Sequence, residues 1–147
     1  MDKKDDFEQM LFLPYLLNQA AEESSLSFQN YYKSHFGLLR TEWRVLFHLG
    51  MYGAMTAREI CLRAKLHKTK VSRAVSGLEK RRYLKREPVQ TDRRSEILHL
   101  LPAGRAVYDN LTSVAREHDA KLTQSFSESE IALLRDMLAR LAGLPNA

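Results

Sequence analysis

Apolar residues recur at three- and four-residue spacing along most of the chain, and this pattern predicts amphipathic helices. Residues 1–13 predict a short helix or a loose arm, after which Pro14 opens a long helix that continues to about Ser34. Gly37 is expected to end this helix, because glycine readily adopts the left-handed conformation found at helix C-termini.

Three more helices are predicted before the pattern changes. Thr41 is the expected N-cap of the first, which stops within 50–53, and Thr56 with Glu59 forms a capping box for a short second helix. The third begins near His67 and has two different sides. The apolar side holds Val71, Ala74, Val75 and Leu78, and the polar side holds Lys68, Thr69, Lys70, Ser72, Arg73, Ser76 and Lys80.

The period then shortens to that of β-strands. Residues 83–89 and 95–101 are predicted strands, and the polar stretch 90–94 is the predicted connection between them. Pro102 restarts a helix, and a second capping box, which begins at Ser127, opens the last one.

The predicted fold is mainly α with a small β-hairpin wing. A helix-turn-helix followed by a hairpin is a winged helix, and long helices precede and follow it here. The apolar stripes of these outer helices are too extensive for so small a middle part to cover. Exposed apolar faces are costly in water, so we expect a second copy of the chain to cover them. The fold class is therefore a winged helix-turn-helix core flanked by long N- and C-terminal dimerisation helices.

Positive charge is concentrated in the middle of the chain. The 147 residues carry 23 Lys and Arg against 18 Asp and Glu, for a net charge of +5. Residues 58–105 hold 14 of the basic and 5 of the acidic side chains, so this segment is +9 and the remainder is −4. Such a basic centre indicates either a polyanion-binding surface or a solvated basic face with no partner.

Composition and motifs exclude several classes of protein. The chain is neither collagen-like nor disordered, and its single cysteine, Cys61, excludes an intrachain disulfide and a cysteine-only zinc site. The histidines are scattered singly, and no nucleophile–base motif or phosphate-binding glycine loop is present. We therefore expect no metal, no cofactor and no enzyme activity. The N-terminus lacks the pattern of a signal peptide and no apolar run is long enough to span a bilayer, so the expected location is the cytoplasm.

Two pieces of the sequence carry the candidate chemistry. An α-helix fits the major groove of B-DNA, and the short polar side chains near the start of the helix at about 67–82 can reach base edges. The second piece is the connection Thr91-Asp92-Arg93-Arg94, because an arginine at a hairpin tip can enter an adjacent minor groove. Asp92 can orient that arginine through a bidentate pair. Each piece alone is a weak signal, but together and in this order they favour DNA binding.

These residues resemble the MarR family of transcriptional regulators. The second-helix signature of that family is similar to Thr41-Glu42-Trp43-Arg44-Val45-Leu46. Its recognition helix is similar to Lys68-Thr69-Lys70-Val71-Ser72-Arg73 followed by Leu78-Glu79-Lys80-Arg81. Its wing and the junction after the wing resemble Asp92-Arg93-Arg94 through Leu98-His99-Leu100-Leu101-Pro102-Ala103-Gly104. The resemblance covers about residues 14–142.

The resemblance implies a homodimeric winged-helix DNA-binding protein; many such proteins are repressors, although the sequence does not separate repression from activation. The two subunits of the homodimer would read the halves of a pseudo-palindromic operator in double-stranded DNA, and a small, often aromatic or phenolic, ligand would release it. Residues 1–36 would be the N-terminal helical part of the dimerisation region, 37–101 the winged-helix DNA-binding domain, and 102–147 the C-terminal dimerisation helices.

The same resemblance implies which residues contact DNA and leaves the ligand-binding residues unassigned. The implied DNA contacts from the recognition helix are Lys68, Thr69, Lys70, Ser72 and Arg73. In the wing, Arg94 would enter the minor groove with Asp92 orienting it, and Arg93 would contact a phosphate. Arg82 departs from the family pattern by replacing a glycine before the first wing strand, where a left-handed non-glycine residue costs about 1 kcal/mol. His67 also departs, because the family usually has Asp or Ser as the cap of this helix, and a protonated ring there would oppose the helix dipole.

Three alternatives remain open at this point. The chain could be a winged-helix module that binds another protein, although such an interface needs apolar anchors on the exposed helix side, which here is polar. Cys61 could sense oxidants, although its place on the apolar side of a short helix favours a packed thiol. A ligand pocket could be lined by Trp43, Phe47, Tyr31, Tyr32 and Phe36, although such an aromatic cluster is more often plain core.

Overall fold

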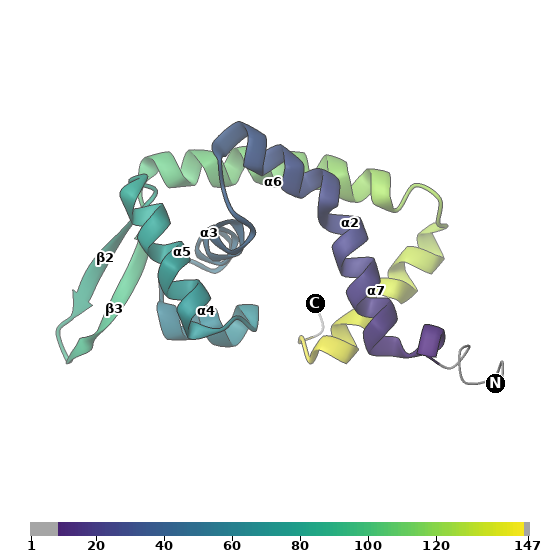
Figure 1. Ribbon diagram of the computed structural model, residues 1–147, viewed down its shortest axis with the longest axis horizontal. Helices are drawn as coiled ribbons and strands as arrows, with labels where there is room; N and C mark the ends of the chain where they lie inside the picture. The colour runs from purple at the N-terminus through teal and green to yellow at the C-terminus, as the bar shows by residue number, and fades with distance from the viewer. Residues whose placement is uncertain (1–8, 146–147) are drawn as a thin grey trace. The chain divides into compact units, whose positions relative to one another are not determined.

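The computed structural model describes residues 9–145, apart from the side chain of Arg93. In chain order the elements are α2 (Leu13–Phe36), α3 (Arg40–Tyr52), β1 (Met55–Thr56), α4 (Ala57–Ala64), α5 (Lys68–Lys80), β2 (Leu84–Val89), β3 (Asp92–Leu100), α6 (Pro102–Leu122) and α7 (Glu128–Ala142) (Figure 1). The chain divides into two compact units, one ending at Val114 and the other beginning at Ala115. The winged helix lies within the first unit.

The first long helix forms as the sequence predicts. Pro14 lies in the first turn of α2, and Gly37 ends the helix in the left-handed conformation, with φ 63°. The amide of Gly37 donates to the carbonyl of Lys33 at 2.9 Å, which satisfies one of the free carbonyls at the helix end. Residues 9–11, in the stretch for which a helix or an arm was predicted, are helical; residues 1–8 lie outside the described part.

The prediction that Thr41 caps α3 is wrong. The helix begins at Arg40, with Leu39 as its N-cap, so Thr41 lies inside the first turn. The carboxylate of Glu42 reaches back and accepts the amide of Leu39 at 2.8 Å. Glu42 is only 5% exposed, and its carboxylate therefore satisfies a helix-start amide within a largely buried environment. This contact makes a hydroxyl cap at position 41 unnecessary.

The short helix α4 begins at its predicted cap. The Thr56 hydroxyl accepts the amide of Glu59 at 3.2 Å, which is the first half of the predicted capping box. Ile60 and Ala64 are buried, and Cys61 is half-buried against the same core. The packed position of the thiol agrees with the structural interpretation of Cys61.

A small antiparallel sheet holds the hairpin, in the strand order β1-β3-β2. Strand β1 was not predicted, because two residues are too few to show an alternating pattern. It pairs Met55 with Leu98, and the hairpin pairs Leu84 with Leu100 and Arg86 with Leu98. Leu84 and Leu98 are each 1% exposed, so one face of the hairpin root closes over the core of the helices.

The aromatic residues near the end of α2 belong to this core. Tyr32 is 2% exposed, and Phe28 packs edge-on against both Tyr32 and Trp43, with ring centroids 5.4 and 5.3 Å apart. Tyr31 and Phe36 pack against the same core. Edge-to-face packing of this kind stabilises a core beyond the area it buries. The aromatic cluster therefore has a structural role in the described fold.

The second unit contains the second predicted capping box in full. The amide of Ser127 donates to Glu130 at 2.9 Å, and the amide of Glu130 donates to the Ser127 hydroxyl at 3.2 Å. Helix α7 has no buried residue in this single chain. Its large exposed apolar side chains are Leu133, Leu134, Met137, Leu138 and Leu141.

Arg82 adopts the left-handed conformation between α5 and β2, with φ 60°. The chain thus keeps the backbone that favours glycine at this place, although the residue is arginine. We expect Arg82→Gly to stabilise the protein by up to about 1 kcal/mol, because glycine has no left-handed penalty. Urea unfolding measures this effect. Arg82→Ala is the matched control, since it removes the same charge and retains the penalty, and equal stability of the two variants would contradict the argument.

Candidate DNA interface

Helix α5 separates an apolar face from a polar one. Its buried residues are Val71, Ala74, Val75 and Leu78, as the sequence predicts. The five residues predicted to contact DNA are all exposed: Lys68, Thr69, Lys70, Ser72 and Arg73. Because the apolar side is fixed in the core, these side chains form one outward surface with three cationic groups and two hydroxyls.

The start of α5 is capped by a histidine ring. The amide of Thr69 donates to Nδ1 of His67 at 3.2 Å. The ring nitrogen thus takes the place of the side-chain oxygen that Asp or Ser supplies at such a cap.

Two contacts hold α5 against the helices before it. The guanidinium of Arg81, just after α5, donates to the carbonyls of Phe36 and Gly37 at 2.6 and 2.7 Å, which ties the end of α2 to the end of α5. In the last turn of α5, Gly77 lies against the carboxylate of Glu42, where an added Cβ would overlap an oxygen. These contacts fix the direction in which the polar face of α5 points.

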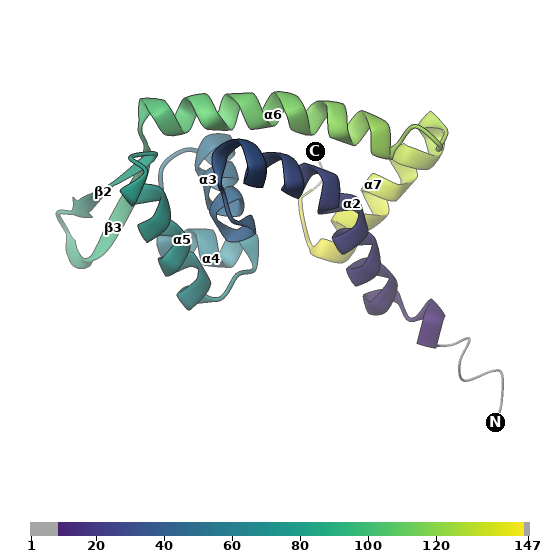
Figure 2. The ribbon, with the colours of Figure 1, turned by 45° about the horizontal axis from the view of Figure 1, so that its top comes forward.

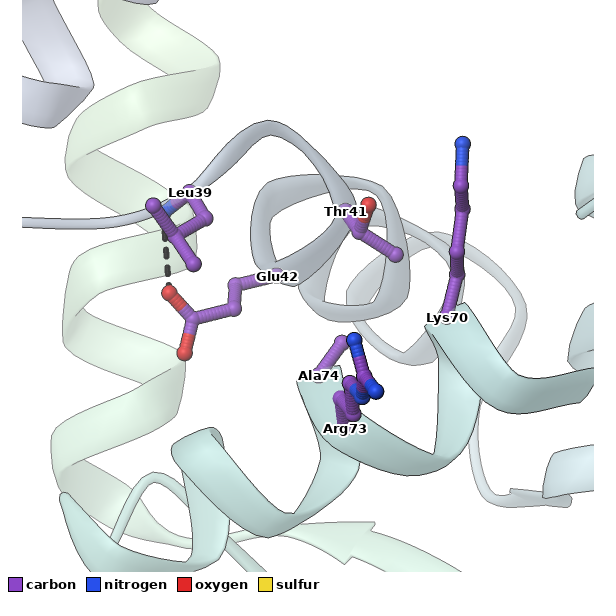
Figure 3. A pocket seen from close by; sticks show the side chains of 6 residues that line it. All are labelled: Leu39, Thr41, Glu42, Lys70, Arg73 and Ala74. Atoms are coloured by element: carbon purple, nitrogen blue, oxygen red, sulfur yellow. Dashed lines mark hydrogen bonds between the residues drawn. The ribbon is translucent and has the colours of Figure 1, made fainter.

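A shallow hollow of about 200 Å³ lies beside that polar face (Figure 3). Its lining comes from the start of α3 and the first half of α5: Leu39, Thr41, Glu42, Lys70, Arg73 and Ala74. Pockets for drug-sized ligands usually measure about 300–1,000 Å³, so this hollow is small for such a ligand. We interpret it as a depression in the basic surface, because two of the residues predicted to contact DNA, Lys70 and Arg73, line it.

The connection between the wing strands is shorter than predicted. Gln90 and Thr91 alone form the turn, and Asp92 already belongs to β3, whereas the prediction placed 90–94 in the loop. The register explains the difference. Val89 pairs with Asp92 while Pro88 pairs with Glu96, so three residues of β3 have no opposite partner and form an irregularity near the tip. A local pattern of polar residues cannot distinguish such an irregularity from a loop.

Asp92 binds differently from the prediction. One carboxylate oxygen accepts the backbone amide of Arg94 at 3.0 Å, and the other accepts the Ser95 hydroxyl at 2.9 Å. The expected bidentate pair with the Arg94 guanidinium is therefore replaced by a turn-like contact with the backbone, which a short carboxylate reaches two residues along the chain. The Arg94 side chain is exposed, and the side chain of Arg93 lies outside the described residues.

These bonds lower the pKa of Asp92 below its ordinary value of 3.8, with the Arg94 amide as the main cause and the Ser95 hydroxyl as the second. The hydrogen bonds of Asp92 require its ionised form. They therefore order the wing tip fully above the pKa that this carboxyl has in the unfolded chain, and they are lost as the pH falls through its lower pKa in the folded protein. We expect the NMR signal of the Arg94 amide to titrate with a midpoint below 3.8. A midpoint at or above that value would contradict the contact.

Sequence reasoning missed Arg81 and Arg86, both of which make several contacts in the described structure. Arg86 lies on β2 and donates to residues of both α5 and β3. One signal was available for it, since it falls on the same alternation as the apolar Leu84 and so on the inner face of the strand. Arg81 had no comparable signal, because the carbonyls that it binds are 44 and 45 residues away in the sequence.

Residues 9–145 contain neither a candidate metal cluster nor a candidate membrane-spanning helix. No group of three or more His, Cys, Asp and Glu side chains in this range could hold a metal ion. No helix in the same range combines the length and the apolar character needed to cross a membrane. The polar face of α5 and the neighbouring hairpin remain as the candidate site.

A three-helix core with an exposed polar helix and a β-hairpin beside it defines a winged helix-turn-helix protein of the DNA-binding class (Figures 1 and 2). A model of the MarR family matches residues 36–95, which include α3, α5 and most of the hairpin. No curated protein matches the chain.

Solved structures extend this similarity over most of the chain. A MarR/EmrR family transcriptional regulator from Acinetobacter sp. ADP1 is 27% identical over 89% of this chain and 92% of its own, with a TM-score of 0.79. A mutant MarR from E. coli in complex with operator DNA is 19% identical over 96% and 99%, with a TM-score of 0.80. BpsR from Bordetella bronchiseptica, whose DNA binding is regulated by 6-hydroxynicotinic acid, is 20% identical over 88% and 98%, with a TM-score of 0.79.

The chain is thus similar to the MarR family of winged-helix transcriptional regulators, by the family model over residues 36–95 and by fold over most of its length. Members of this family are regulators and not enzymes, in agreement with the expectation from the sequence.

Proposed function

We propose that the chain is a sequence-specific regulator that binds double-stranded operator DNA as a homodimer. The observation that carries this proposal is the exposed face of α5, which presents short polar and cationic side chains next to the hairpin. In the proposed complex, Lys68, Thr69, Lys70, Ser72 and Arg73 contact the major groove. Arg94 enters the adjacent minor groove from the wing, where Asp92 orders its backbone.

Homodimerisation accounts for the exposed apolar residues outside the winged helix. In the first unit these include Leu13, Tyr15, Leu16 and Leu26 on α2, each at least 41% exposed. In the second unit α7 presents five large apolar side chains and buries none. Exposed apolar surface on this scale favours a partner, and two copies in one symmetric dimer would present two recognition helices to the two halves of a palindrome. On this basis 1–36 and 102–147 form the dimerisation region, and 37–101 the DNA-binding domain.

We further propose that the protein is a repressor released by a small aromatic or phenolic ligand. The support is the fold shared with BpsR, whose DNA binding is regulated by 6-hydroxynicotinic acid. A ligand of this kind would be recognised by its effect on DNA affinity, so candidate compounds are screened for release of the bound operator.

Fluorescence anisotropy tests the DNA-binding proposal directly. The protein is titrated into labelled DNA from upstream of its own gene and into a scrambled duplex of equal length, at two salt concentrations. We expect at least about a thousandfold preference for the upstream DNA, the range of specific regulators. Equal and weak binding that disappears as salt rises would leave only charge attraction and would favour the alternative, a winged-helix module that binds another protein.

A further inference from the structure

We propose that Arg86 is a positioning residue that fixes the wing against the recognition helix α5, so that both can contact one operator. The effect of Arg86 on operator binding rests on the proposed function, whereas its contacts with α5 and β3 are present in the free protein. Arg86 was not among the residues predicted to bind DNA.

Arg86 occupies the inner face of its strand. It pairs with Leu98, and Leu84, two residues before it, pairs with Leu100. Side chains alternate along a strand and directly paired residues share a face, so Arg86 lies on the same face as Leu84 and Leu98, which are both buried. Arg86 itself is exposed, with its side chain 33% accessible, so its guanidinium lies at the edge of this face, where it can reach acceptors on α5 and β3.

The guanidinium donates to three acceptors from two elements. Nε donates to Oε2 of Glu79 at 3.1 Å and Nη2 donates to the Ser76 hydroxyl at 3.2 Å, both on α5. Nη1 donates to Oε2 of Glu96 on β3 at 3.4 Å. The planar fork of arginine can reach three such acceptors at once, whereas a lysine ammonium is a compact charge on a flexible stem.

These contacts extend the attachment of the wing beyond its root. The root is held by backbone bonds, in which the amide of Tyr83 donates to Leu78 and the amide of Leu101 donates to Tyr83. Arg86 lies on β2, three residues beyond Tyr83, and its contacts add a link between the two wing strands and α5. A wing that is already held in place loses little freedom when it binds, so the second contact with DNA adds more to affinity.

The hairpin also provides a matched control. Lys85 is the neighbouring cation, and by alternation it lies on the opposite, outward face, paired with His99. Replacing either residue by methionine removes one positive charge at the same distance along β2, but only Arg86→Met removes the link to α5.

Two measurements test the proposal, namely anisotropy with operator and scrambled DNA, and hydrogen exchange of the free protein. We expect Arg86→Met to weaken operator binding about tenfold more than Lys85→Met, with equal effects of the two variants on the scrambled duplex. Arg86→Lys keeps the charge and should still lose most of this affinity. Amides of residues 84–100 should exchange faster in both Arg86 variants, while those of α6 keep the rate of the wild type.

One further variant separates positioning from simple charge. Arg86→Met leaves Glu79 and Glu96 without their shared cation, and these carboxylates would repel DNA. In Arg86→Met with Glu79→Gln and Glu96→Gln this repulsion is removed, and we expect operator binding to stay weaker than that of Glu79→Gln with Glu96→Gln. Full recovery would overturn the positioning role.

Other outcomes also decide against it. Equal operator affinity of Arg86→Met and Lys85→Met would overturn the proposal. The slope of log K against log salt concentration provides another test. If this slope falls by about 0.9 for Arg86→Met on both DNAs and does not fall for Lys85→Met, Arg86 contacts a phosphate directly and the proposal is overturned. If the wild type does not prefer the operator, the proposed function fails instead. In that case hydrogen exchange of the free protein still tests the link to the wing. Unchanged amide exchange at residues 84–100 in Arg86→Met would refute the link, and faster exchange would support it.

Discussion

Gly104→Ala is expected to destabilise the protein by about 2 kcal/mol, a typical cost of forcing extra volume into a packed site. Gly104 is buried in the first turn of α6, and a Cβ at this position would overlap the backbone carbonyl of Tyr83. That carbonyl accepts the amide of Leu101 at 2.9 Å, so it cannot move away without breaking a bond at the root of the wing. The close approach of two backbones requires the residue without a side chain.

Whether Gly104→Ala lowers or raises stability distinguishes a close backbone approach from an open helix position. In a helix with free space, replacing glycine by alanine stabilises the protein by about 0.5–1 kcal/mol, because alanine has the higher helix propensity. Urea unfolding at one fixed protein concentration measures the change, since a dimer's stability depends on concentration. Ala106→Ser, at an exposed position of the same helix, is the control and should change stability by no more than about 0.5 kcal/mol. A gain in stability for Gly104→Ala would refute the close approach.

Arg94→Ala is expected to weaken operator binding by about 1–3 kcal/mol, which is the range for an arginine that contacts a groove. The Arg94 side chain is exposed near the wing tip. The Asp92 carboxylate orders the backbone that carries this side chain, because it accepts a hydrogen bond from the Arg94 amide at 3.0 Å. The guanidinium is therefore available to enter a narrow minor groove, whose negative potential attracts it.

Lys85→Ala, which removes one cation from the outward face of the same hairpin, is the control for Arg94→Ala. Anisotropy at several salt concentrations separates the two roles. A cation that only attracts phosphates changes operator and scrambled DNA alike, whereas a groove contact changes the operator more. If Arg94→Ala binds the operator as tightly as the wild type, the assignment of Arg94 as the wing contact is wrong.

The helices could be predicted well because their signals are local. The periodic apolar residues of α5, the Thr56 cap and the Ser127–Glu130 capping box each act within four residues. The one failed cap illustrates the limit of such reasoning. Thr41 has the favoured residue type, but Glu42 satisfies the amide of Leu39 from a largely buried position, and the helix therefore begins earlier.

The features that position the site depend on contacts across the fold, and these could not be predicted. The bonds from Arg81 to the end of α2 join residues far apart in sequence, and strand β1 exists only because β3 lies beside it. The wing was predicted as a hairpin, but its irregular register near the tip, and hence the backbone contact of Asp92, follows from the pairing of the strands.

Hydroxyl-radical footprinting of the DNA upstream of the gene tests the central claim most directly. If two recognition helices of one dimer enter successive major grooves, the protein should protect two sites whose centres are about 10 bp apart on one face of the duplex. Arg94→Ala should lose protection in the minor groove beside each site and retain it elsewhere. Protection that is uniform along the duplex, or absent at concentrations that saturate binding, would contradict sequence-specific recognition by α5 and the wing.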